Sequence, residues 1–139
     1  MTTSNVLATD ALALQLPTYT AFDAVEALHV KQLQQFLRES DNAYDRSNLV
    51  AHVVADVWIV NPTRDQVVLV EHALSHRWLA PGGHCDGNPD VFANAVREAE
   101  EETGLTDLKP LLAGAIFDIN AAPVETRKVH GSIEPGQRV

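Results

Sequence analysis

Residues 88–105 read NPDVFANAVREAEEETGL, a stretch that carries its own start and stop signals for a helix. At the start, Asn88 can cap free backbone amides, Pro89 suits the first helical position, and Asp90 favours the positive end of the helix dipole. Gly104 stands where a left-handed residue would end the helix. The stretch therefore predicts a helix that begins at Pro89 and stops just before Gly104. Its small apolar face consists of Val91, Ala95 and Ala99.

The second half of this helix carries more negative charge than local propensity would choose. Its acids are Glu98, Glu100, Glu101 and Glu102. The helix dipole makes an acid at this end unfavourable by about 0.3–1 kcal/mol. Glu98, Glu101 and Glu102 share one face through i,i+3 and i,i+4 spacing, so they repel one another. Arg97 can reach Glu101, but one guanidinium does not neutralise three carboxylates, and a bound divalent cation would.

The type of ligand atom indicates which cation would bind. Carboxylate oxygens are hard ligands, so Mg²⁺ or Mn²⁺ fits this face better than zinc does. Magnesium commonly combines a few carboxylates with water and substrate phosphate, so the face indicates phosphate chemistry. The alternative is a solvated acidic face, which is the commoner outcome for a run of charges. The mismatch with the helix dipole weighs only moderately against that alternative.

The rest of the chain indicates one further helix and several strands. Residues 1–20 show no sustained period and are expected to form a loose arm or an edge element. From Phe22 to Leu37, apolar residues recur at helical spacing, which predicts an amphipathic packing helix. The predicted strands are His52–Val60, Gln66–Glu71, Arg77–Ala80 and Leu111–Ile119.

Turn-forming residues separate these strands. Residues 61–65 are expected to join the first two strands into a β-hairpin. Pro81-Gly82-Gly83 is expected to end the third strand and to open a loop. Residues 120–139 contain several prolines and glycines in a polar background, so they are predicted to be loop as well.

Composition and charge narrow the class of protein. A chain of 139 residues with 45% hydrophobic residues has the size and the apolar content of one compact domain. Its formal charge of -9 and pI near 4.9 argue against a nucleic-acid polymer as partner, because such binding depends on clustered Lys and Arg. Cys85 cannot form an internal disulfide, the first residues lack the charged, then apolar, then small-residue order of a secretory signal, and the longest apolar runs are far shorter than a membrane span. A cytoplasmic protein is therefore expected.

The run from Gly83 to Leu105 resembles the Nudix box, G-x5-E-x7-R-E-U-x-E-E-x-G-U, in which U is apolar. Residues 97–105 satisfy every fixed position of its second half, and Gly83 lies at the required distance upstream. Residues 78–82 also resemble the strand and turn that precede this box in the family. The resemblance covers His52 to Leu105, and less specifically residues 111–120. It implies an α+β Nudix fold, in which a mixed β-sheet is sandwiched between α-helices.

The resemblance also implies roles for individual residues. Glu98, Glu101 and Glu102 become the metal ligands and, with Arg97 orienting them, the catalytic residues. The glycine pair 82–83 becomes a substrate-binding element, because its backbone can approach substrate closely; an ordinary turn is the alternative, and both can hold together.

One fixed position of the box departs from the pattern. Its first glutamate falls on Pro89, which has no carboxylate, and Asp86 and Asp90 are the candidates to compensate for it.

The predicted organisation has two parts, an arm with the amphipathic helix over residues 1–49 and a Nudix domain over residues 50–139. The family normally continues beyond its box through further strands and a second helix, so this domain is expected to be short at its C-terminus. Three explanations stay open: a shortened product, a sheet completed by another subunit, or a domain that no longer catalyses.

The function implied by the resemblance is Mg²⁺-dependent hydrolysis of a nucleoside diphosphate derivative by attack of water at phosphorus. The rival from another class is a non-catalytic Nudix-like module that binds a nucleotide or a protein, which the short C-terminus favours. A homodimer formed through the helix from Phe22 to Leu37 is compatible with either. Neither the substrate nor the general base can be assigned from the sequence.

Histidines and the cysteine offer weaker candidates. His84 and Cys85 follow the glycine pair, but neither has a partner at a recognised zinc spacing and no paired base is evident, so both are expected to be loop residues. The remaining histidines are expected to lie on the surface or in the core without a catalytic role. They are His29, His52, His72, His76 and His130.

Overall fold

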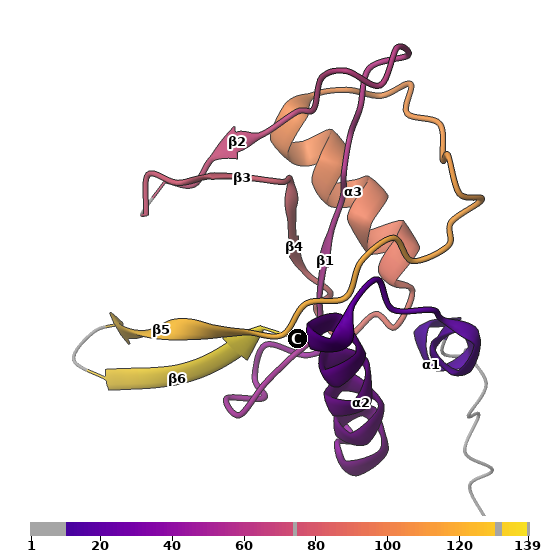
Figure 1. Ribbon diagram of the computed structural model, residues 1–139. Helices are drawn as coiled ribbons and strands as arrows, with labels where there is room; N and C mark the ends of the chain where they lie inside the picture. The colour runs from indigo at the N-terminus through magenta and orange to yellow at the C-terminus, as the bar shows by residue number, and fades with distance from the viewer. Residues whose placement is uncertain (1–10, 74, 130–131, 139) are drawn as a thin grey trace, which may run out of the picture.

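The protein combines helices with small antiparallel sheets in an α+β arrangement (Figure 1). The computed structural model describes residues 11–73, 75–129 and 132–138. The helical elements are α1 (Ala11–Gln15), η1 (Leu16–Thr18), α2 (Ala24–Glu39) and α3 (Val91–Thr103). The strands are β1 (Val54–Asp56), β2 (Val70–Glu71), β3 (Trp78–Leu79), β4 (Gly82–His84), β5 (Ala122–Val129) and β6 (Ser132–Arg138).

The acidic helix α3 ends where the sequence predicts. Gly104 adopts a left-handed conformation with φ 72°, and its N–H donates to the Glu100 carbonyl over 2.9 Å. The predicted start is wrong by two residues, because α3 begins at Val91 and Asp90 caps it by accepting from Ala93 N–H over 2.9 Å. Asn88 instead accepts a hydrogen bond from Asp90 N–H, so it holds the residue that caps the helix.

The glycine pair lies in a strand, so the predicted loop at this position is wrong. Strand β4 pairs antiparallel with β1, with Ala55 opposite Gly83 and Asp56 opposite Gly82. Helix α3 packs against both strands (Figure 1). The local sequence resembles a turn because of its glycines, but a strand partner far away in the sequence extends the segment.

The turn of the predicted β-hairpin is present, but its two strands do not pair with each other beyond the turn. Asn61 N–H donates to the Gln66 carbonyl over 3.2 Å, and Val60 forms an antiparallel bridge with Val67. Beyond this bridge the two arms separate: β1 pairs with β4, and β2 pairs with β3. The strand predicted at residues 77–80 is confirmed as β3.

The amphipathic helix is confirmed as α2, which is capped by Asp23 through the N–H groups of Val25 and Glu26. Val30 and Leu33 on this helix are buried in the core. Another stripe of the helix is solvent-exposed, with exposed fractions of 61% for Val25 and 54% for Leu28, and Phe22, which precedes the helix, is 95% exposed. A homodimer that covers this stripe stays a prediction.

Part of the predicted loose arm is ordered against the core. Residues 11–18 form α1 and η1, and Leu12 and Leu16 are 4% and 3% exposed. The loose arm was therefore a wrong expectation for these residues, while residues 1–10 lie outside the described part. One buried cluster holds Leu12, Leu16, Val30, Leu33, Val53, Ala55, Cys85 and Ile119. It takes residues from both sides of the predicted boundary at residue 50, and that boundary stays a prediction.

A buried carboxylate joins the N-terminal helices to the segment after α3. Glu26 is 6% exposed and accepts hydrogen bonds from the Tyr19 hydroxyl, from Phe22 N–H and, over 2.9 Å, from Ile119 N–H. The Tyr19 hydroxyl also lies 3.2 Å from the Phe117 carbonyl oxygen. The hydrogen bond from Tyr19 is the main reason why the pKa of Glu26 lies below its usual value.

The prediction of a strand at residues 111–119 is wrong. Ala113 and Gly114 adopt positive φ values of 51° and 79°, which interrupts any extended conformation. Further along, Ile116 N–H donates to the Gln15 side chain over 3.1 Å, and Ile119 N–H donates to Glu26. Helix side chains thus take the hydrogen bonds that a neighbouring strand would have taken.

The C-terminal segment also differs from its prediction as a loop. Strands β5 and β6 pair antiparallel into a ribbon that extends away from α3 (Figure 1). Pro135, which has no N–H to donate, lies where the register shifts between Val124 and Arg127 on the facing strand. His130 lies outside the described residues. In the part of the chain that the structure describes, no helix is long and apolar enough to cross a membrane.

Candidate metal and substrate site

Two glutamates of α3, Glu98 and Glu102, lie against strand β4. Glu98 lies against Gly83: a Cβ atom on this glycine would stand 2.6 Å from both Cδ and Oε1 of Glu98. The side chain of Glu98 is accordingly only 14% exposed. The missing side chain of Gly83 therefore creates the space that this carboxylate occupies.

Glu102 reaches the neighbouring glycine one turn further along α3. Its Oε2 atom accepts a hydrogen bond of 3.1 Å from Gly82 N–H. Because Glu98 and Glu102 are four residues apart, they lie on one side of the helix and end on consecutive residues of β4. The glycine pair thus contacts two of the three predicted metal ligands.

Arg97 connects the third predicted ligand to this arrangement. Its Nη1 atom lies 2.9 Å from Glu98 Oε1 and 3.2 Å from Glu101 Oε2, and its Nη2 donates to the His84 carbonyl over 2.9 Å. Burial alone would lower the pKa of Arg97, but the charges of Glu98 and Glu101 outweigh it and raise that pKa. The guanidinium therefore stays charged and fixes both carboxylates relative to β4.

Of the six residues predicted for the site, Glu98, Glu102 and Arg97 contact β4 at Gly83, Gly82 and the His84 carbonyl, and Glu101 joins them through its ion pair with Arg97. Within the described ranges, however, no group of three or more His, Cys, Asp or Glu side chains is arranged to hold a metal ion. The residues that are present nevertheless suit a hard cation. The three predicted ligands are carboxylates, which hard cations prefer. The absence of a Cβ atom on Gly83 also leaves room for one of these ligands, Glu98.

The two acids considered as substitutes for the glutamate missing at Pro89 have other contacts. Asp86 forms an ion pair with Arg46, with Nη2 and Oδ1 2.6 Å apart. Asp90 caps the N-terminus of α3, at the opposite end of the helix from Glu102. The contact described for Asp90 holds the start of α3, the contact described for Asp86 binds Arg46, and neither contact involves the acidic face.

One acidic residue near the glycine pair escaped sequence reasoning. Asp56 ends β1 and stands directly opposite Gly82 in the antiparallel register. A Cβ atom on Gly82 would lie 2.1 Å from Asp56 Oδ1. No local motif marks this aspartate, because only the pairing of β1 with β4 brings it to the site.

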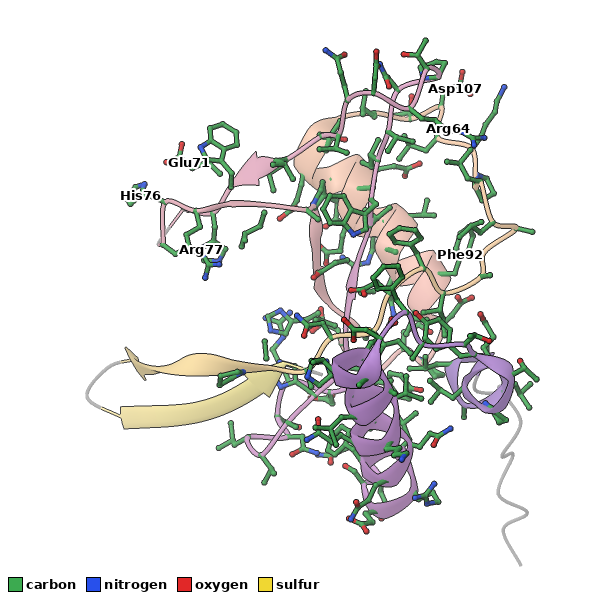
Figure 2. The ribbon with its side chains drawn as sticks, in the orientation of Figure 1. Arg64, Glu71, His76, Arg77, Phe92 and Asp107 are labelled. Carbon is green, nitrogen blue, oxygen red and sulfur yellow. The ribbon has the colours of Figure 1, made fainter. Side chains whose placement is uncertain are left out.

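The side chains of His84, Cys85 and His76 each have contacts or burial that the fold explains. His84 belongs to the strand rather than to a loop, and its ring stacks on that of His52 with centroids 5.1 Å apart. Cys85 is buried in the core, where burial raises the pKa of its thiol to about 11. His76 pairs with Glu71 over 3.0 Å at the outer end of the β2–β3 ribbon (Figure 2). The prediction of a loop residue is therefore wrong for His84, which lies in β4, and is confirmed for Cys85, which follows the end of that strand.

Comparison with known proteins places the site in a family. A curated protein of Bacillus subtilis (strain 168), described as the uncharacterized Nudix hydrolase YvcI, is 36% identical to this chain over 52 residues. That match covers 37% of this chain and 33% of the Bacillus protein, so the chain spans about a third of that relative. The family model described as NUDIX domain matches residues 50–127, which include the whole box and both strands that pack on α3. Because this match covers more than half of the chain, the protein belongs to the NUDIX domain family.

Proposed function

We propose that this protein hydrolyses the diphosphate linkage of a nucleoside diphosphate derivative in a reaction that depends on Mg²⁺, with Mn²⁺ as a possible replacement. The observation that carries the proposal is the convergence of Glu98 and Glu102 on the glycine pair of β4. Membership of the family supports a hydrolase. The typical use of divalent metal ions in this family supports the dependence on Mg²⁺.

Each residue of the site has a distinct part in this proposal. Glu98, Glu101 and Glu102 would hold the metal ion, and Arg97 keeps Glu98 and Glu101 in place through its two ion pairs. Gly82 and Gly83 would bind substrate, since their backbone is approachable where no side chain stands. When bound, magnesium would withdraw charge from phosphorus and lower the pKa of the attacking water.

The reaction balances as a hydrolysis. The oxygen of one water molecule forms a bond to phosphorus, and the bond between that phosphorus and the bridging oxygen breaks. The bridging oxygen leaves with the second phosphate, so the products are a nucleoside monophosphate and the phosphorylated second moiety. The proton of the water passes to a general base, which the proposal leaves unassigned because a base is identified by its distance from the water.

The substrate class follows from the family and stays broad. Nucleotides, nucleotide sugars and dinucleoside polyphosphates all contain the linkage. We also propose that the domain has the Nudix fold, in which a mixed sheet lies between helices, and that the antiparallel pairs around α3 are part of this sheet. The cytoplasmic location expected from the sequence stays a prediction.

A binding module without catalysis is the second candidate, and one observation favours it. The Arg97 guanidinium already neutralises part of the charge on Glu98 and Glu101. The three carboxylates are not arranged as a metal cage within the described residues. Such a module would hold a diphosphate or a protein partner on the same face and would release no product.

The test is product release from a panel of nucleoside diphosphate derivatives in the presence of Mg²⁺. The wild type should release monophosphate, and Glu101→Gln should abolish metal-dependent release while leaving the thermal unfolding curve unchanged. Glu100→Gln is the matched control, because Glu100 lies on the same helix, is exposed, and is outside the assigned set. Equal turnover of Glu101→Gln and the control would remove Glu101 from the site, and binding without release by the wild type would favour the module.

A further inference from the structure

A cavity of about 720 Å³, here called the hairpin pocket, lies between the hairpin of residues 59–68 and the segment that follows α3. Figure 2 shows Arg64 of the hairpin turn and Asp107 of that segment at the same end of the molecule. Two neutral amides, Asn61 and Gln66, line the pocket, and none of the described residues that line it is charged. Its other walls are aliphatic side chains from both segments: Ile59, Val60, Val67, Val68, Leu105 and Leu108.

The hairpin pocket lies on the face of the sheet that carries Glu98. Ala55 stands directly opposite Gly83, and Glu98 lies against Gly83. Burial alternates from Ala55 to Ile59, because both of these residues are buried while those at 56 and 58 are exposed. Ala55 and Ile59 therefore face the same side, which is the side of α3.

The pocket begins about one helical turn beyond the acidic face. Leu105, which lines the pocket, follows Glu102 by three residues, or roughly 5 Å along a helix axis. Glu98 and Glu102 contact the residues of β4 that stand opposite Ala55 and Asp56, so α3 advances along β1 in the direction of the pocket. A ligand with its phosphates at the acidic face thus reaches the pocket with its organic part.

The lining suits one kind of organic group. A hexose presents hydroxyls over most of its surface, and aliphatic walls cannot satisfy their hydrogen bonds. A nucleobase has two apolar faces, which can pack against such walls, and a polar edge. The Gln66 amide can both donate to and accept from such an edge.

The wall that holds Gln66 is fixed before any ligand arrives. The Asn61 side chain accepts from the N–H groups of Asp65 and Gln66 over 3.1 and 3.2 Å. It also donates to the Asp65 carboxylate over 2.6 Å. A wall that is already ordered loses little entropy when it binds a ligand.

We propose that the hairpin pocket binds the nucleobase of the substrate, with Gln66 at the edge of the base. The volume of the pocket lies within the roughly 300–1,000 Å³ of small-molecule sites. This inference rests on the proposed function and deepens it, because it separates the base, held in the pocket, from the diphosphate, held at the acidic face.

The experiment measures binding of the base without phosphate or metal. Adenosine, guanosine, cytidine and uridine are each titrated into the full chain, and amide chemical shifts are followed by nuclear magnetic resonance. We expect the wild type to bind at least one nucleoside, whereas ribose, which lacks the base, should not bind. Val67→Trp fills the pocket from a position that is 49% exposed, and it should weaken nucleoside binding by about tenfold or more.

Leu69→Trp is the matched control. Leu69 lies two residues further along the chain, is 37% exposed and is not among the residues that line the pocket. This variant should bind the nucleosides like the wild type. If thermal unfolding shows that Val67→Trp does not fold, Gln66→Ala replaces it and should weaken binding by about threefold or more, through the loss of one hydrogen-bonding group.

The outcomes separate this inference from the proposed function. The base site is overturned if the wild type binds none of the four nucleosides, if it binds ribose equally well, or if the folded pocket variant keeps wild-type affinity. Release of monophosphate in the presence of Mg²⁺ still decides the proposed hydrolysis in each of these cases. Nucleoside binding that the pocket variant weakens, without product release by the wild type, supports the base site and overturns the hydrolysis.

Discussion

Replacing Glu26 with alanine should destabilise the fold strongly, although Glu26 lies outside the acidic helix. Its carboxylate accepts hydrogen bonds from three donors, the Tyr19 hydroxyl, Phe22 N–H and Ile119 N–H, and it also interacts with the Asp118 side chain. Truncation leaves all three donors without this acceptor. The consequence differs among them, because their access to other acceptors differs.

Ile119 contributes most of the expected loss. It is 6% exposed, and a buried N–H without a partner costs about 1–3 kcal/mol. The Tyr19 hydroxyl still has the Phe117 carbonyl 3.2 Å away, and Phe22 is 95% exposed, so its N–H lies where water is available. These two donors together add about 1 kcal/mol, because each exchanges one acceptor for another. The total loss in the free energy of unfolding should be about 2–4 kcal/mol.

Urea unfolding at neutral pH, followed by circular dichroism, measures this loss. Glu39→Ala is the control, because Glu39 is the last residue of the same helix and bonds to Gln35 on the exposed surface. The control should change the free energy of unfolding by less than about 0.5 kcal/mol. A loss below about 1 kcal/mol for Glu26→Ala would show that Ile119 N–H finds another partner, and the reasoning would then be refuted.

Three further predictions follow from contacts already described. Because the pKa of Glu26 is lower in the folded protein, the contribution of Glu26 to stability is fully present above its unfolded pKa of 4.5. This contribution is lost as the pH falls through the lower pKa of the folded state, and acid unfolding of Glu26→Gln should lack this loss. Gly83→Ala should weaken Mn²⁺ binding with little change in the melting temperature, because the nearest atoms to its Cβ belong to the carboxylate end of Glu98. Gly82→Ala should lower the melting temperature, because its Cβ meets backbone atoms of β1, and equal effects of the two variants on stability would contradict this contrast. If the wild type sediments as a dimer, Leu28→Glu on the exposed stripe of α2 should sediment as a monomer, and an unchanged dimer would place the interface elsewhere.

Local signals predicted the acidic helix well. Gly104 and the spacing of the glutamates are sufficient to define its end and its charged face, because both depend on residues within two turns. Its start was displaced because Asn88 and Asp90 can both cap a helix, and only the structure shows that Asp90 does so. The assignment of Glu98, Glu101 and Glu102 to a metal ion stays a prediction.

Features that depend on distant pairing were not predictable in this way. The glycine pair reads as a turn until β1 pairs with it, and Asp56 has no local mark at all. Residues 111–119 read as a strand because they are apolar, yet their N–H groups at Ile116 and Ile119 bind side chains of Gln15 and Glu26. Sequence patterns report local propensity, whereas the contacts of Ile116 with Gln15 and of Ile119 with Glu26 join residues 101 and 93 positions apart.

The bonds from Gln15 and Glu26 have a practical consequence for anyone preparing the protein. The family match begins at residue 50, which makes that position a tempting place to trim the chain for expression. Cutting there would remove both side chains that hold residues 116–119, and it would uncover Val53, Ala55 and Cys85 by deleting the helices that pack on them. Trimmed material is therefore expected to aggregate, and samples for titration or crystallisation should retain everything from α1 onward.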